Sequence, residues 1–314
     1  MNNKTKKELL SNSAIYKKLS TYLLPDISAI CFDYFINIRD RPLFKAIDMN
    51  DIQLLKYLVS KEIELGKKHN VNGCIGKITA LMYAVKIGKV ECVEILANTK
   101  ELGMKDKDGK TALMYAAKIG KVECVEILAN TKELGMKDKD GWTALMYAAM
   151  NGKYECVKLF AKTKEIGMRD NGICTALIYS SRKGNNECVK ILANTKELCM
   201  KDIDGRTALI YATAMRKYEC VKILAKTKEI GMKDENDRTA LMYAARYGLA
   251  KCVKILVKTK ELGVKNKYGW TALMYASKWG TIECVKILKN TRKNKCKRMN
   301  WFNIMKTKII QYLN

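Results

Sequence analysis

Seven closely similar segments of 32 residues follow one another without a gap in this sequence. The stretch Thr-Ala-Leu-(Met/Ile)-Tyr-(Ala/Ser) begins each of them, always at a threonine. These are Thr79, Thr111, Thr143, Thr175, Thr207, Thr239 and Thr271. A fixed period of this length is typical of solenoids, in which each unit packs mainly on its neighbours. The sequence therefore predicts a linear array of stacked units.

Residues 111–142 show what each segment is expected to form. Thr111 is a good N-cap for a short helix that Gly120 ends. Apolar residues at helical spacing, between Val122 and Leu128, then predict a second helix. A polar turn with Asp-Gly at its tip leads to the next threonine. Because short helices are marginally stable alone in water, stacking must bury their apolar faces.

The repeats divide the chain into four parts. Residues 79–295 hold the seven repeats, and residues 41–78 align with them as a degenerate first unit with a longer loop. Residues 1–40 and 296–314 contain amphipathic segments. We expect the first to form an N-terminal helical cap and the second a C-terminal capping helix, since the ends of a stack must face water.

The core of each unit is predicted from the same pattern. We expect Leu81, Ala84, Val93 and Leu96 to be buried, together with their equivalents every 32 residues in the central units.

Composition excludes several classes of protein. Hydrophobic residues make up 48% of the chain, too many for a disordered tail. No stretch approaches the roughly 18–20 consecutive apolar residues of a membrane span. No signal peptide is apparent. We therefore expect a soluble protein of a reducing compartment, cytoplasmic with a nuclear location left open.

The opening T-A-L-x-x-A-A-x-x-G, followed by a second helix and a loop, resembles ankyrin repeats over roughly residues 41–295. The period is 32 instead of the common 33, and only Pro42 keeps the proline of that family's opening. The wording looks most like the large ankyrin-repeat families of diplomonad protozoa. The resemblance implies an all-α ankyrin-repeat solenoid of stacked helix–turn–helix units with short hairpin-like loops. It also implies protein binding without catalysis.

A cysteine occupies one position of the second helix in every repeat. These residues are Cys92, Cys124, Cys156, Cys188, Cys220, Cys252 and Cys284. A redox or metal array is one interpretation, and a small buried hydrophobic residue is the other. Packed helices lie about 8–10 Å apart, whereas disulfide-bonded Cα atoms need about 4.4–6.8 Å. No C-x2-C or Cys/His cluster is present. We therefore expect these thiols to be buried, reduced and unpaired.

No residue set in the sequence suggests catalysis or cofactor binding. His69 is the only histidine, and we expect it in a loop without catalytic partners. Phosphate-binding glycine motifs are missing. Acidic residues are scattered, and we expect them on exposed faces and turns. We predict no enzyme, no catalytic residue, no cofactor and no metal.

A tyrosine follows the Met or Ile of every repeat. The ladder consists of Tyr83, Tyr115, Tyr147, Tyr179, Tyr211, Tyr243 and Tyr275. Its rings could shield the inner helices, or they could contact a partner. A structural role is favoured because a partner surface usually changes from unit to unit, but both interpretations stay open.

The positions that differ between repeats are expected to determine which partner the protein binds. They lie just before each threonine and at the end of the first helix. The resemblance to ankyrin repeats puts both on the loop tips and the concave face, where Trp142 and Trp270 would be exposed. Exposed Trp, Tyr and Arg are common at binding hot spots. We predict a protein-binding face, with its primary site across residues 238–279. The predicted partner-binding residues are Trp142 and, within 238–279, Arg238, Tyr243, Arg246, Tyr247, Trp270, Tyr275, Lys278 and Trp279.

The net charge of +27 is concentrated toward the C-terminus. Residues 111–142 hold five basic and five acidic residues, whereas residues 239–270 hold seven basic residues and one acidic residue. The densest basic run contains Lys289, Arg292, Lys293, Lys295, Lys297 and Arg298. An alternative function is therefore binding of an acidic surface, nucleic acid or anionic membrane lipid by this end. A lysine-rich surface without a partner explains the charge equally well.

A further alternative comes from residues 23–38. Their Leu-Pro opening is similar to that of F-box helices, which would make the chain a ubiquitin-ligase substrate adaptor. A helical cap explains the same residues. We expect the protein to be monomeric.

Overall fold

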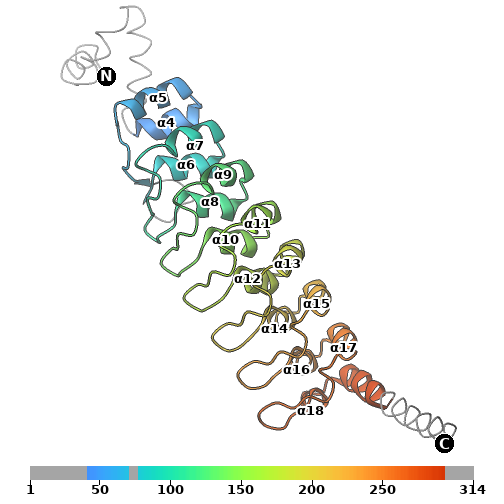
Figure 1. Ribbon diagram of the computed structural model, residues 1–314. Coiled ribbons are helices and arrows are strands. Elements are labelled where there is room, and N and C mark those ends of the chain that lie inside the picture. Colours follow the sequence, from blue (N-terminus) through green and yellow to red (C-terminus); the bar gives the residue numbers. More distant parts are fainter. Residues whose placement is uncertain (1–40, 71–76, 294–314) are drawn as a thin grey trace, which may run out of the picture.

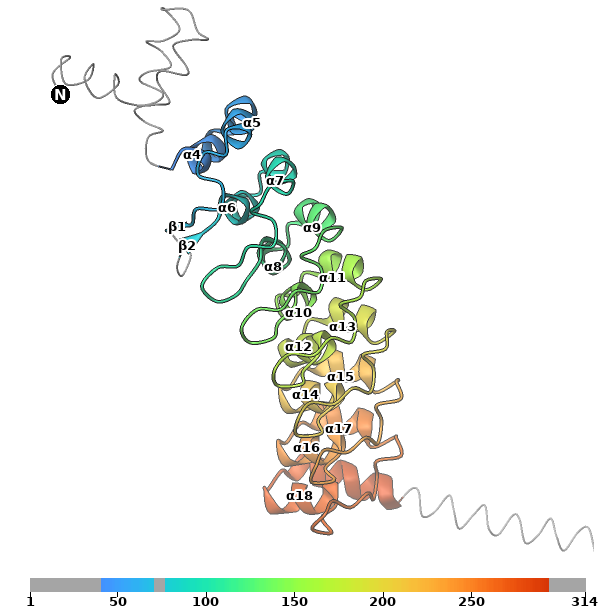
Figure 2. The same cartoon turned by 60° about the vertical axis from the view of Figure 1, so that its left-hand side comes forward.

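The computed structural model describes residues 41–70 and 77–293. Helix pairs stack in these residues into an elongated array (Figure 1). The first helices of the units form one row, the second helices form another, and the loops between units project from the side of the first row (Figures 1 and 2). The prediction of an all-α repeat solenoid is confirmed.

The elements follow the repeat. The first helices are α4 (Pro42–Met49), α6 (Ala80–Ile87), α8 (Ala112–Ile119), α10 (Ala144–Met150), α12 (Ala176–Lys183), α14 (Ala208–Ala214), α16 (Ala240–Arg246) and α18 (Ala272–Lys278). The second helices are α5 (Ile52–Ser60), α7 (Val90–Leu96), α9 (Val122–Leu128), α11 (Tyr154–Phe160), α13 (Asn186–Leu192), α15 (Tyr218–Leu224) and α17 (Ala250–Leu256), and a last helix runs over 282–293. Two short strands, β1 (His69–Asn70) and β2 (Lys77–Ile78), pair antiparallel in the long loop of the first unit.

The first helix of unit 111–142 begins and ends where the sequence predicts. The Thr111 hydroxyl accepts a hydrogen bond from the Met114 amide at 3.4 Å, which satisfies one of the free N–H groups at the start of α8. Gly120 ends α8 with a positive φ of 92°, a conformation that glycine adopts without strain.

The expected core is present. Leu81, Ala84, Val93 and Leu96 are fully buried, as are the residues at the same positions in the five units between residues 111 and 270. In the last unit Leu273 is only half-buried, because no further unit among the described residues covers it. The seven cysteines of the second helices are buried and unpaired, so that prediction is confirmed. Burial raises the pKa of the Cys156 thiol to about 11, which keeps it protonated and unreactive at neutral pH.

A ladder of buried glutamates corrects the expectation that acidic residues lie on exposed faces. The glutamate ladder consists of Glu101, Glu133, Glu165, Glu197, Glu229 and Glu261, all almost fully buried. The Glu133 carboxylate accepts hydrogen bonds from the Leu113 amide at 2.7 Å and the Gly103 amide at 2.8 Å. It therefore joins the start of α8 to the loop of the preceding unit. Burial raises the pKa of Glu133, while its hydrogen bonds from the two backbone amides lower it.

The expected helical caps at 1–40 and 296–314 and the F-box-like segment at 23–38 lie outside the described residues. None of the described helices has the length and apolar character needed to cross a membrane.

Candidate interaction surface

The loop between two units is a tight turn built around an aspartate. In the loop before α10, the Asp138 carboxylate accepts hydrogen bonds from the amides of Asp140 at 3.0 Å and Trp142 at 2.8 Å. Its other oxygen accepts a hydrogen bond from the Tyr147 hydroxyl at 2.6 Å. The loop is thereby fixed to the first helix of the next unit. Successive loops are also joined, as where the Lys139 amide donates to the Asp108 carbonyl at 3.1 Å.

The tyrosine ladder takes part in this arrangement. The same tyrosine–aspartate bond recurs from Tyr115 to Asp106, from Tyr211 to Asp202 and from Tyr243 to Asp234. At the last unit Asn266 replaces the aspartate and donates to the Tyr275 hydroxyl at 2.9 Å. Because these tyrosine hydroxyls are hydrogen-bonded to the loops and their rings are at least partly buried, a structural role for the ladder is favoured.

Trp142 and Trp270 lie at the ends of these loops but are not free, which corrects the expectation that their rings are exposed. Both rings are half-buried and pack on the first helices. The centre of the Trp142 ring lies 4.2 Å from that of Tyr179 and 5.1 Å from that of Tyr147. The Asp138 turn explains this position, because it fixes the Trp142 backbone beside the tyrosine row.

The C-terminal units bring several of the predicted site residues together. The Trp279 ring stacks on Tyr275 with ring centres 5.5 Å apart. The Trp270 and Trp279 rings meet edge to face, with their centres 6.2 Å apart. The Arg246 guanidinium lies 5.0 Å from the centre of the Trp279 ring, and the Lys278 ammonium lies 5.1 Å from it. We call Arg246, Tyr247, Trp270, Lys278 and Trp279 the aromatic–cation cluster.

The other predicted residues of region 238–279 lie beneath or beside this cluster. Tyr243 and Tyr275 are only 7% and 8% exposed, so they support the surface more than they form it. Arg238 is held by Asp234, with 2.8 Å between Nε and Oδ2. Trp142 belongs to a distant unit and touches none of the cluster residues. The sequence offered no direct signal for these differences, because burial depends on neighbouring units and the pairing of Arg238 depends on the folded shape of its loop.

Within residues 41–70 and 77–293, the cations of the cluster lack acidic partners. Among the described residues, neither Arg246 nor Lys278 forms an ion pair with a carboxylate. The single acidic residue of unit 239–270, Glu261, is buried in the glutamate ladder. Glu283 of the next unit pairs with Lys254 at 3.3 Å. The exposed surface of unit 239–270 is therefore entirely basic or neutral.

The basic run at the C-terminus is only partly described. Lys289, Arg292 and Lys293 are exposed on the helix over 282–293, whereas Lys295, Lys297 and Arg298 lie outside the described residues. Position 293 is the equivalent of the ladder glutamates, so the glutamate ladder ends at Glu261.

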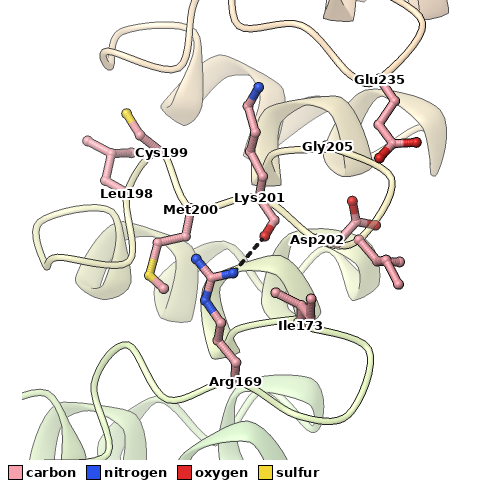
Figure 3. Close-up of a pocket in the computed structure, with 10 residues that line it drawn as sticks. Arg169, Ile173, Leu198, Cys199, Met200, Lys201, Asp202, Gly205 and Glu235 are labelled. Atoms are coloured by element: carbon pink, nitrogen blue, oxygen red, sulfur yellow. Dashed lines mark hydrogen bonds between the residues drawn. The ribbon is translucent and has the colours of Figure 1, made fainter.

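A shallow pocket of about 540 Å³ lies between the loops near residues 169–205 (Figure 3). Ile173 and Cys199 line it, and both occupy loop positions that are glycine in most other units. Ile173 has a φ of 62°, which is strained for a β-branched residue. A Cβ added at the equivalent Gly141 would meet the Asn171 amide at 2.8 Å. The Ile173 side chain therefore holds the next loop away, and the described residues contain no 172–203 backbone hydrogen bond like those between other neighbouring loops.

His69 lies in β1 instead of an irregular loop. Its ring meets the Phe44 ring edge-on with centres 5.1 Å apart, and its Nε2 lies 3.6 Å from a Glu64 carboxylate oxygen. This is the packing of a structural histidine. Within residues 41–70 and 77–293, no group of three or more His, Cys, Asp or Glu side chains is placed to hold a metal ion.

Comparison with known proteins agrees with this geometry. The family model described as "Ankyrin repeats (3 copies)" matches residues 81–170, 162–234 and 226–299, which is more than half of the chain. No curated protein matches the sequence. Ankyrin repeats are generally protein–protein interaction modules and typically not enzymes. The helix pairs, the projecting loops and the family match lead to one conclusion: this chain belongs to the ankyrin-repeat family.

Proposed function

We propose that this protein is a non-enzymatic scaffold that binds a protein partner on the face formed by its first helices and loops. The primary docking site is the aromatic–cation cluster of units 239–270 and 271–293. The single observation that supports this choice best is that two cations, Arg246 and Lys278, lie against aromatic rings and have no carboxylate partner in the part of the chain that the structure describes. Trp279 and Tyr247 add apolar surface there, being 42% and 39% exposed.

The rest of the same face supports this location. Arg206 and Arg238 occupy the loop ends of earlier units, and each is paired with an aspartate of its own loop. Their charge is therefore already compensated within the protein. Exposed aromatic and arginine side chains at the centre of a patch are typical of interaction hot spots.

The test is an affinity capture with the whole chain, quantified by mass spectrometry. We expect a reproducible binder to be lost with the double substitution Arg246→Ala and Trp279→Ala. The matched control is Lys118→Ala with Trp142→Ala, which removes one cation and one tryptophan from the same face of earlier units. Equal capture by the cluster variant and the wild type would refute the site.

The basic C-terminal end is a second candidate, supported by the exposure of Lys289, Arg292 and Lys293 on one helix. Binding of nucleic acid or anionic membrane lipid through this run would weaken steeply as the salt concentration rises. An interface based on the cluster's aromatic residues would change less. Capture at two salt concentrations separates the two.

The remaining expectations belong to the same proposal. The division into parts at residues 41, 79 and 296, a monomeric state and a cytoplasmic or nuclear location are proposed from the sequence. A relationship to the diplomonad families is proposed from the sequence pattern of the repeats alone. An adaptor role for residues 23–38 is a further alternative, proposed from one short motif.

A further inference from the structure

The two cations of the cluster are held in place by the rings beneath them. The Lys278 ammonium lies 4.7 Å from the centre of the Trp270 ring and 5.1 Å from that of Trp279. The Arg246 guanidinium lies 5.0 Å from the Trp279 centre and 5.6 Å from the Tyr247 centre. Cation–π contacts of this kind restrict long side chains before any ligand arrives. A ligand therefore loses less conformational entropy when it pairs with them.

The spacing of the two cations has an upper limit that admits a pair of carboxylates. Since both cations lie about 5 Å from the same Trp279 ring centre, they are no more than about 10 Å apart. Carboxylates on alternate residues of an extended peptide lie on one side of the strand, roughly 7 Å apart. One such pair of side chains can meet Arg246 and Lys278 together.

The surroundings favour a negatively charged ligand. In earlier loops an aspartate, such as Asp202 or Asp234, lies beside the tyrosine ladder. In the last loop this position is Asn266, which is neutral. Glu261 is buried and bonded to two backbone amides. The other acidic residue between 239 and 293, Glu283, is paired with Lys254.

The rings are poorly placed to stack on nucleobases. Sequence-tolerant binding of single-stranded nucleic acid depends on open aromatic faces. Here the cluster's own residues already lie against the rings: Tyr275 and the two cations contact Trp279, and Lys278 contacts Trp270. What the cluster offers a ligand is paired positive charge with partly exposed apolar edges beside it.

We propose that the aromatic–cation cluster recognises an acidic, extended peptide segment of a partner protein, with carboxylates on alternate residues and an apolar side chain beside them. The inference rests on the proposed function and specifies the chemistry of its partner.

The test uses the full chain and a fluorescein-labelled peptide of six glutamates and two phenylalanines, followed by fluorescence anisotropy. A matched peptide with glutamine in place of glutamate is expected to bind at least tenfold more weakly. The protein variant Arg246→Gln with Lys278→Gln should weaken binding of the acidic peptide at least tenfold. The control variant Lys251→Gln with Lys258→Gln removes the same charge from two exposed positions, one in helix α17 and one just after it. It should change the affinity less than threefold.

The other outcomes overturn the inference. Equal weakening by both variants would mean that net charge alone attracts the peptide. Stronger binding of a single-stranded oligothymidylate, lost with Arg246→Gln and Lys278→Gln, would make the cluster a nucleic-acid site. Cluster-dependent binding to phosphatidylserine vesicles in place of the peptide would make it a lipid site. If affinity capture loses a protein with Trp279→Ala while the acidic peptide does not bind, the proposed function stands and only the acidic chemistry fails.

Discussion

Units 111–142 and 239–270 have nearly the same interior and different surfaces. Both begin Thr-Ala-Leu-Met-Tyr-Ala-Ala, both bury a cysteine in the second helix, and both bury a ladder glutamate. The first carries five basic and five acidic residues, whereas the second carries seven basic and one acidic. The interior is copied because each unit must fit two neighbours of the same shape. The surface is free to differ, so it is where a unit acquires a function.

The largest effect is expected from the shared interior. Replacing Glu133 or Glu261 with Ala leaves two backbone amides without an acceptor in a buried site. Each substitution should lower the free energy of unfolding by about 3 kcal/mol, measured by urea denaturation. Glu126→Ala, at an exposed position of α9, is the control and should change it little. Unequal losses at Glu133 and Glu261 would show that the two interiors are not equivalent.

Two tryptophans distinguish a ring that stabilises the fold from a ring that forms the surface. Trp142 packs between Tyr147 and Tyr179, so Trp142→Ala should reduce stability by about 2 kcal/mol. Trp279 is 42% exposed, and Trp279→Ala should reduce it by less than about 1 kcal/mol. Thermal denaturation followed by circular dichroism measures both. If Trp279→Ala is the more damaging change, that ring belongs to the core and not to a binding surface.

A gain in stability is expected in the loop that contains Ile173, because both compared units have glycine at that loop position. Gly141 and Gly269 accept a positive φ without strain in those two units, but Ile173 has a positive φ at the same position with a branched side chain. Ile173→Gly should therefore raise the free energy of unfolding by about 1 kcal/mol. Ile203→Gly, at an exposed position of the next loop, is the control and should give no gain. No gain from Ile173→Gly would mean that the loop is not strained.

The smallest effect concerns the tyrosine ladder at alkaline pH. Burial, with a hydrogen bond to Asp48, raises the pKa of Tyr83 to about 12, above the value of about 10 for an unfolded tyrosine. Burial likewise raises the pKa of Tyr147. Because the folded-state pKa is the higher one, this contribution to stability is complete below pH 10 and is lost as the pH rises toward 12. Urea midpoints measured between pH 8 and 12 should fall less steeply for Tyr83→Phe than for the wild type. Identical pH profiles would argue against a buried, hydrogen-bonded ladder.

The sequence by itself determined the architecture. The 32-residue period, the threonine at each helix start and the apolar spacing predict the stacked helix pairs and their core. These features act within one unit or repeat identically in the next, so a single unit contains enough information. The burial of the ladder cysteines could be predicted for the same reason.

Only the tertiary structure decided which polar and aromatic residues are buried or paired within the protein. Glu133 is buried because amides 20 and 30 residues away in the sequence converge on its carboxylate. Its recurrence in six units, and its replacement by Lys293 at the end, was a signal that sequence reasoning missed. The packing of Trp142 on Tyr179 likewise joins residues of different units, whereas the pairing of Arg238 with Asp234 depends on the turn of their shared loop. The unpaired state of Arg246 and Lys278 was visible only once those pairings were known, because a charge is free or compensated according to its neighbours in space.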